Sequence, residues 1–319
     1  MKVLLDTNIL TRMAQPAHTQ YQAAQNAVDA LVYTDIGMDP MTYSLAFSRL
    51  APVQCTTWGH PDTTGLKTID YFLSSQWMET AEANTHYSEP LVRLPSLSLY
   101  FDRSKPPPIL VDRAAFGLST TARLYVCPQS IFKFHPDFDE AIASILRHDH
   151  EAQLVLIRSI SSQATEQLRG RFSRTMPDVA GRIVFLPHLE QAEFFNLLLL
   201  ADVVLDPFPY CGGISSLEAF SLGVPVVTLP TEFLRGRFTQ AFYRRLGIES
   251  CIARNVDNYI EIALRLGTDL AFRKQMHDQI IAGQPRLFED EAAIRDWEEF
   301  LRWAARDCYH TKSSTIGAR

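Results

Sequence analysis

Residues 203–229 read VVLDPFPYCGGISSLEAFSLGVPVVTL, two short apolar segments joined through a glycine pair and a longer amphipathic segment. The apolar segments at 203–206 and 225–229 are rich in valine, which favours β-strands. Residues 215–222 between them have the spacing of a helix. Because parallel strands need a crossover connection, usually a helix, this unit predicts a parallel sheet.

The same alternation of strand and helix recurs through the middle of the chain. Further strands are predicted at 124–127, 153–158 and 183–186, and helices at 138–147, 164–175, 191–200 and 237–246. About five such units between 123 and 250 predict a doubly wound α/β domain. Upstream, strands are predicted at 2–5, 31–34, 53–58 and 69–73, and the proline-rich segment 95–122 reads as an interdomain linker. We therefore expect two α/β domains.

The composition excludes several classes of protein. The chain has 319 residues, 46% of them apolar, and a formal net charge of −6. This balance is typical of a globular protein and provides no general attraction to nucleic acid or acidic membranes. No apolar stretch has the roughly 18 residues that a membrane span needs. The five cysteines are scattered and no cluster of histidine and cysteine stands out, so we expect no disulfide framework, no metal site and a cytoplasmic location.

The strongest candidate site follows the strand predicted at 203–206. In a doubly wound sheet, ligands bind beyond the carboxyl ends of the strands. Gly212 and Gly213 allow a close approach of the backbone, and Ser215 and Ser216 open a helix whose free N–H groups favour a phosphate. Glu218 follows in the first turn, where a carboxylate could accept two hydroxyls of a ribose. Plain helix capping by glycine, serine and glutamate remains the alternative.

Two further candidates follow other strands. Lys133 comes after the strand 124–127, where a lysine can neutralise a diphosphate, although most lysines are simply solvated. His60 lies in the turn GHPDTTG (59–65), where it could serve as a base or a sugar ligand. A turn histidine that bonds the backbone is the alternative.

Four blocks of the sequence carry a resemblance to a known family. They are RLAPVQCTTWGHPDTTGLKTIDYFLSS (49–75), YVCPQSIFKFHPDFDE (125–140), FLPHLEQAEFFNLLLLADVVLDPFPYCGGISSLEAFSLGVPVVTLP (185–230) and IARNVDNYIEIALRLGTDL (252–270). In this order they resemble the catalytic region of the O-linked N-acetylglucosamine transferases, glycosyltransferase family 41. The resemblance implies two Rossmann-like lobes of the B-type glycosyltransferase fold, with the N-terminal lobe truncated.

The family also implies an activity. It is the metal-independent, inverting transfer of a sugar, expected to be N-acetylglucosamine, from a UDP-sugar to Ser or Thr of a protein acceptor. No cofactor is implied. The alternative that we keep is a truncated fusion product that binds UDP without catalysing transfer.

Site residues follow from the same resemblance. Lys133 is expected to contact the diphosphate, Glu218 to bind the ribose, and His60 to line the sugar pocket. The remaining donor-binding residues implied are Ser130, Leu189, Gln191, Phe194, Gly213, Ile214, Ser215 and Ser216. Of these, Leu189, Gln191 and Phe194 would surround the uracil. The phosphate turn departs from the family, because it reads Ile-Ser-Ser where the animal enzymes have His-Thr-Thr.

The beginning of the chain resembles a different family. Residues 1–30, with Asp6-Thr7-Asn8, resemble the opening strand and helix of PIN-domain toxin ribonucleases. One carboxylate is too few for a catalytic Mg²⁺ site, so we do not expect nuclease activity. The expected domains are a PIN-like fragment (1–30), a partial N-terminal lobe with linker (31–122), the UDP-sugar-binding lobe (123–308) and a disordered tail (309–319).

Overall fold

The computed structural model describes residues 3–4 and 29–316, with side chains over 29–306. The PIN-like resemblance of residues 1–30 therefore lies almost wholly outside the described residues. The chain divides into two compact units, residues 1–100 together with 290–319, and residues 101–289. This division differs from the expected one at both ends of the second unit, because residues 101–122 belong to it and residues 290–308 do not.

The first unit contains a five-stranded parallel sheet with the strands in chain order. They are β1 (Val3–Leu4), β2 (Ala30–Tyr33), β3 (Val53–Thr57), β4 (Tyr71–Ser75) and β5 (Leu91–Leu94), with the short helices α3 (Pro40–Leu45) and η1 (Ala83–His86) between them. β4 begins two residues later than predicted, and β5 was not predicted. The N-terminal half of α11 (Glu291–Ile316) covers this sheet, burying Phe300, Leu301 and Ala304 against Ala30, Val32 and Leu73.

The end of α11 differs from the sequence prediction. The helix extends to Ile316, into the tail for which the sequence predicts disorder. Its polar contacts tie it to the segment after β5, since Asp296 accepts a hydrogen bond from Ser96 N at 2.8 Å. Trp297 Nε1 donates to the carbonyl of Ser98 at 3.0 Å. These contacts explain why the last helix belongs with the first sheet.

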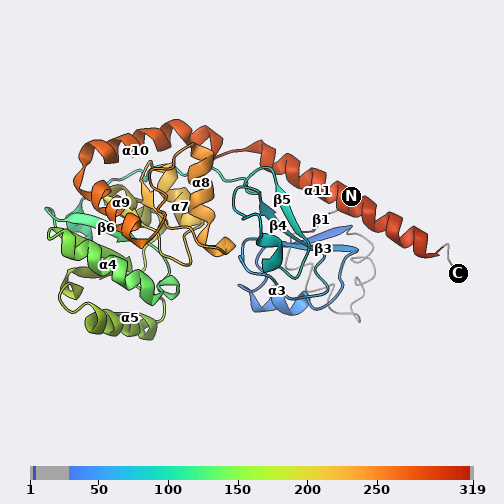
Figure 1. Cartoon of the computed structure of the whole chain (residues 1–319), viewed down its shortest axis with the longest axis horizontal. Helices are drawn as coiled ribbons and strands as arrows, with labels where there is room; N and C mark the ends of the chain where they lie inside the picture. Colours follow the sequence, from blue (N-terminus) through green and yellow to red (C-terminus); the bar gives the residue numbers. More distant parts are fainter. Residues whose placement is uncertain (1–2, 5–28, 317–319) are drawn as a thin grey trace. The chain divides into compact units, whose positions relative to one another are not determined.

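The second unit, in which β6, α4 and α9 are labelled in Figure 1, contains another five-stranded parallel sheet. Its strand order is β10-β9-β6-β7-β8. Its strands are β6 (Arg123–Cys127), β7 (Ala152–Ile157), β8 (Ile183–Leu186), β9 (Val203–Leu205) and β10 (Val226–Val227). The chain runs outward from β6 to β8 and then returns to β9 on the other side of β6. The strand order therefore reverses between β6 and β9, which is where doubly wound sheets bind their ligands.

Helices cover both faces of this sheet. Successive side chains of a strand point to opposite faces, so each strand contacts both helix layers. Leu124 and Val126 of β6 pack with Leu197 of α6 in one apolar cluster. Tyr125, between them, points to the other face, where its hydroxyl group lies against Gly267 of α9. The helices are η2 (Arg113–Phe116), η3 (Ile131–Lys133), α4 (Pro136–His148), α5 (Ser162–Thr175), η4 (Ala180–Arg182), α6 (Gln191–Leu200), α7 (Ile214–Ser221), η5 (Leu234–Gly236), α8 (Phe238–Leu246), α9 (Val256–Thr268), α10 (Leu270–Gly283) and η6 (Gln284–Arg286).

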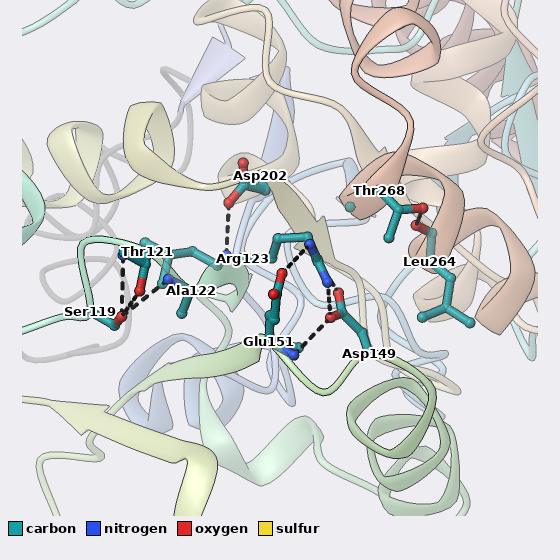
Figure 2. Close-up of polar contacts among 12 residues, drawn as sticks. Ser119, Thr121, Ala122, Arg123, Asp149, Glu151, Asp202, Leu264 and Thr268 are labelled. Atoms are coloured by element: carbon teal, nitrogen blue, oxygen red, sulfur yellow. Dashed lines mark hydrogen bonds and ion pairs between the residues drawn. The ribbon is translucent and has the colours of Figure 1, made fainter.

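Charged residues anchor the amino end of β6, as Figure 2 shows. The Arg123 guanidinium contacts Asp149 at 2.5 Å and Glu151 at 2.7 Å. Asp202, just before β9, accepts a hydrogen bond from Leu124 N at 2.8 Å and also pairs with two arginines, Arg113 and Arg273, at 3.0 Å each. Asp202 therefore joins β6 to β9 at the end of the sheet opposite to Asp206.

Candidate functional site

The loops that follow β6 and β9 meet through one hydrogen bond from Lys133 and one from Gln129. Its ammonium donates to Gln129 Oε1 at 3.1 Å and to the Cys211 carbonyl at 2.9 Å. Gln129 in turn donates from Nε2 to the hydroxyl of Ser215, at the start of α7. These contacts bring together the lysine and the serine that the sequence predicted separately.

Lys133 is a partly buried cation. Burial lowers the pKa of its ammonium, and the nearby carboxylate of Asp206 opposes that shift. Its Nζ also lies 4.5 Å from the centre of the Tyr210 ring, a cation–π distance. An anion bound at this site would stabilise the charged ammonium group and so offset the effect of burial.

Asp206 organises the turn between β9 and α7. Its side chain is 1% exposed and accepts hydrogen bonds from Gly212 N at 2.5 Å and from the Thr228 hydroxyl at 2.7 Å. Burial raises the pKa of this carboxyl group to about 6. Asp206 thus links Gly212 of this turn to Thr228, which follows β10.

Gly212 is required by its surroundings. A Cβ at this position would lie 2.5 Å from both Gln129 Nε2 and Ser216 Oγ, so any side chain would break the contacts between the two loops. Gly213 is the N-cap residue of α7 and supplies no capping side chain. A Cβ on Gly213 would meet only Phe238, at 3.9 Å.

The two serines of α7 have different surroundings. Ser216 is 2% exposed and shares a hydrogen bond with the Thr239 hydroxyl at 2.9 Å, whereas Ser215 contacts Gln129 across the loop. Neither side chain is the helix cap, because the N-cap is Gly213. The capping alternative therefore does not account for the serines.

Glu218 lies one turn after Ser215 and is partly buried, and burial raises the pKa of its carboxyl group. Among the described residues, no hydrogen-bond donor reaches its carboxylate. The predicted ribose ligand is thus a half-buried acid whose acceptors are open to a ligand.

A cavity of about 830 Å³ lies at the carboxyl ends of β6, β7 and β8. Three predicted donor contacts line it, Ser130, Leu189 and Phe194, and so does Gln129. Its lining includes the arginines Arg158, Arg171 and Arg174 and no carboxylate. Gln191 and Ile214 do not line it and are exposed.

His60 lies in the first unit, in the loop after β3. Its ring packs against Gly37, where a Cβ would lie 2.5 Å from the imidazole, and its buried Nδ1 has no hydrogen-bond partner among the described residues. Glu89 holds the turn after it, accepting hydrogen bonds from the Thr63 hydroxyl at 2.7 Å and from Thr64 N at 2.9 Å. Nδ1 of His60 therefore makes no hydrogen bond to the backbone of the described residues, unlike the alternative expected for a turn histidine.

Over the described part of the chain, no group of three or more His, Cys, Asp or Glu side chains is arranged to hold a metal ion. Within the same residues, no helix is long and apolar enough to cross a membrane.

Comparison with known proteins identifies the family. The model for glycosyl transferase family 41 matches residues 101–290, which include the whole site after β6 and β9. The chain belongs to glycosyltransferase family 41. It has an α/β fold with two parallel sheets, the B-type glycosyltransferase fold.

Several relatives of family 41 resemble the chain. The probable UDP-N-acetylglucosamine–peptide N-acetylglucosaminyltransferase SPINDLY of Solanum lycopersicum is 29% identical over 226 residues, 70% of this chain and 24% of the relative. The UDP-glucose:protein N-beta-glucosyltransferase of Actinobacillus pleuropneumoniae serotype 7 is 27% identical over 248 residues, 77% of this chain and 39% of the relative. The chain thus spans between about a quarter and two fifths of these relatives.

Solved structures show the same fold. A mutant O-GlcNAc transferase of Thermobaculum terrenum has a TM-score of 0.77 and 27% identity, over 90% of this chain and 55% of that one. The sucrose-phosphate synthase of Thermosynechococcus elongatus has a TM-score of 0.62 at 11% identity, over 91% of this chain and 77% of that one, and shows the fold alone.

Sequence reasoning did not find three residues that organise the candidate sites of the two units. Gln129 is separated by one residue from a predicted strand and lies inside one of the blocks that carry the resemblance, but no residue pattern singles it out. Asp206 was noted only as the end of a strand. Glu89 lies outside the blocks that carry the resemblance, 25 positions from its partner Thr64.

Proposed function

We propose that the second unit binds a UDP-sugar and that the chain transfers the sugar to a protein hydroxyl. The observation that carries this proposal is the junction of Lys133, Gln129 and Ser215 between the ends of β6 and β9. A cationic donor, a hydroxyl and the start of a helix converge there, and together they suit the two phosphates of a nucleoside diphosphate.

The remaining predicted contacts fit the same ligand. Glu218, with open acceptors, suits the ribose hydroxyls, and the cavity beside Gln129 offers apolar walls at Leu189 and Phe194 for the base. Arg158 and Arg174 in the lining favour an anionic ligand there, whereas Arg171 is paired with Asp139 at 2.7 Å. We therefore propose that the nucleotide occupies both the junction and the adjoining part of the cavity.

The chemistry is a displacement at the anomeric carbon of the sugar. A Ser or Thr oxygen of the acceptor forms a bond to this carbon, the bond to the β-phosphate oxygen breaks, and UDP leaves with the electron pair. The configuration inverts, and the proton of the acceptor hydroxyl is released to solvent. Lys133 and Ser215 would stabilise the charge that develops on the diphosphate, without a metal ion. We propose that His60 contacts the sugar or the acceptor.

The sugar and the acceptor are the finer part of the proposal. The printed names of the relatives include transfer of N-acetylglucosamine to peptides and of glucose to proteins. We propose N-acetylglucosamine as the sugar, Ser or Thr of a cytoplasmic protein as the acceptor, and no nucleic acid or membrane as partner.

The test combines binding and transfer on one preparation. UDP binding is measured by calorimetry, with Lys133→Ala as the comparison. Transfer is measured from radiolabelled UDP-N-acetylglucosamine and from UDP-glucose to a mixed protein lysate. Transfer that depends on Lys133 would support the proposal. UDP binding without transfer of either sugar would favour an inactive UDP-binding protein, and absence of UDP binding would refute both.

A further inference from the structure

Gln129 is a buried polar residue whose role the proposed site does not yet explain. The residue is 7% exposed and follows β6 after Pro128. It contacts Lys133 on one side and Ser215 on the other, and it also lines the cavity. A buried amide that makes both contacts is held in one orientation.

The chemistry of Lys133 fixes the direction of the Gln129 amide. An ammonium group has three donors and no acceptor, so the atom that faces it at 3.1 Å must be the carbonyl oxygen Oε1. The amide nitrogen Nε2 then faces the Ser215 hydroxyl, to which it can only donate.

This direction sets the polarity of the Ser215 hydroxyl. A serine hydroxyl has one proton and two lone pairs, and one lone pair is occupied by the hydrogen bond from Gln129. Its own proton cannot point to Nε2, so it is free to be donated elsewhere. No other side chain of the described residues accepts it.

Lys133 is left with a free donor as well. Two of its three N–H groups are bound to Gln129 and to the Cys211 carbonyl. The third N–H and the Ser215 proton are then both available to one ligand, and an anion is the acceptor that such a pair of donors suits.

We propose that Gln129 is a positioning residue that orients Lys133 and Ser215 as donors to the diphosphate of the nucleotide. It acts through these two residues, and its effect is confined to the phosphates. This inference rests on the proposed function, because it names how the same site recognises its ligand.

Gln129→Glu tests the polarity of the amide. A carboxylate accepts from both neighbours, so the Ser215 proton turns towards it and is lost to the phosphates, while Lys133 gains a salt bridge. We expect UDP affinity, measured by calorimetry, to fall roughly ten- to a hundredfold. Uridine lacks phosphates, so its affinity is expected to stay the same.

A double-mutant cycle with Ser215→Ala separates positioning from a general effect of charge. Without the hydroxyl, Gln129→Glu has no Ser215 proton to divert, and its effect on UDP affinity should be smaller by about fivefold or more. Gln153→Glu is the matched control, because Gln153 lies at the amino end of β7 and its Oε1 accepts from Ser119 N at 3.3 Å. This control should leave UDP affinity unchanged.

Gln129→Met, of similar length, keeps the test open if the carboxylate disturbs folding. It removes both hydrogen bonds and should weaken UDP but not uridine. Equal losses of UDP and uridine affinity, or an undiminished effect in the Ser215→Ala background, would overturn the inference while leaving the proposed function standing. A wild-type chain that binds no UDP would overturn the proposed function and this inference with it.

Discussion

Asp206→Asn should change how the stability of the protein depends on pH. The Asp206 side chain is 1% exposed, and its pKa is raised from 3.8 to about 6 by burial. Between these two values the folded protein holds a proton that the unfolded chain releases. The stabilisation by the protonated carboxyl group is therefore complete below pH 4 and is lost as the pH rises through 6.

The size of this effect follows from the shift. A shift of about two pKa units corresponds to about 3 kcal/mol of unfolding free energy, at 1.36 kcal/mol per unit. Asparagine has the same shape, can accept from Gly212 N through its oxygen and can donate to the Thr228 hydroxyl. It therefore preserves both contacts without a titrating group.

The assay is urea unfolding of both proteins at several pH values from 4 to 7. Relative to Asp206→Asn, the wild type should lose about 3 kcal/mol of unfolding free energy across this range. Parallel curves for the two proteins would refute the assignment of a raised pKa to Asp206. Collapse of the variant at every pH would instead show that the contacts themselves require the carboxylate.

Three further predictions concern ligand binding and transfer. Lys133→Ala should lower UDP affinity roughly ten- to a hundredfold through loss of a charge-assisted hydrogen bond, and unchanged affinity in the folded variant would contradict this. Because burial lowers the Lys133 pKa, wild-type UDP affinity should fall as the pH rises through that lowered value. Calorimetry at several pH values checks both. Glu218→Ala should weaken UDP but not inorganic pyrophosphate, and equal losses in calorimetry would mean that Glu218 acts through the helix dipole. His60→Ala should leave UDP affinity intact and lower the rate of transfer from radiolabelled UDP-sugar; a loss of UDP affinity would contradict a role limited to the sugar and acceptor.

The sheet of the second unit could be predicted from local pattern. Its strands are short, valine-rich and separated by amphipathic helices, so the expected and observed positions of β6 and β9 agree within a residue or two. Because both strands end at the same edge, Lys133 and Ser215 could be expected near one another. Their actual junction depends on Gln129, whose side chain has no sequence periodicity to reveal it.

The first unit shows where local pattern is insufficient. Ile69 is apolar and suggested the start of a strand, but it belongs to a core cluster beside Leu31 and Tyr33, and the strand begins at Tyr71. The amphipathic pattern of α11 shows that one face is buried, but it does not say which sheet buries it. That choice depends on contacts such as Ser96 with Asp296, which are 200 positions apart.

The position of α11 has a consequence for synthesis of the chain. The sheet formed by residues 30–94 leaves the ribosome with one apolar face uncovered, because Phe300 and Leu301 are translated about 200 residues later. At about 5–20 residues per second, the 200 residues between Ser96 and Asp296 take roughly 10–40 s to translate. The second unit is continuous in sequence and can fold within that interval. The first unit is completed only after it, and its apolar face is meanwhile open to chaperones and to aggregation.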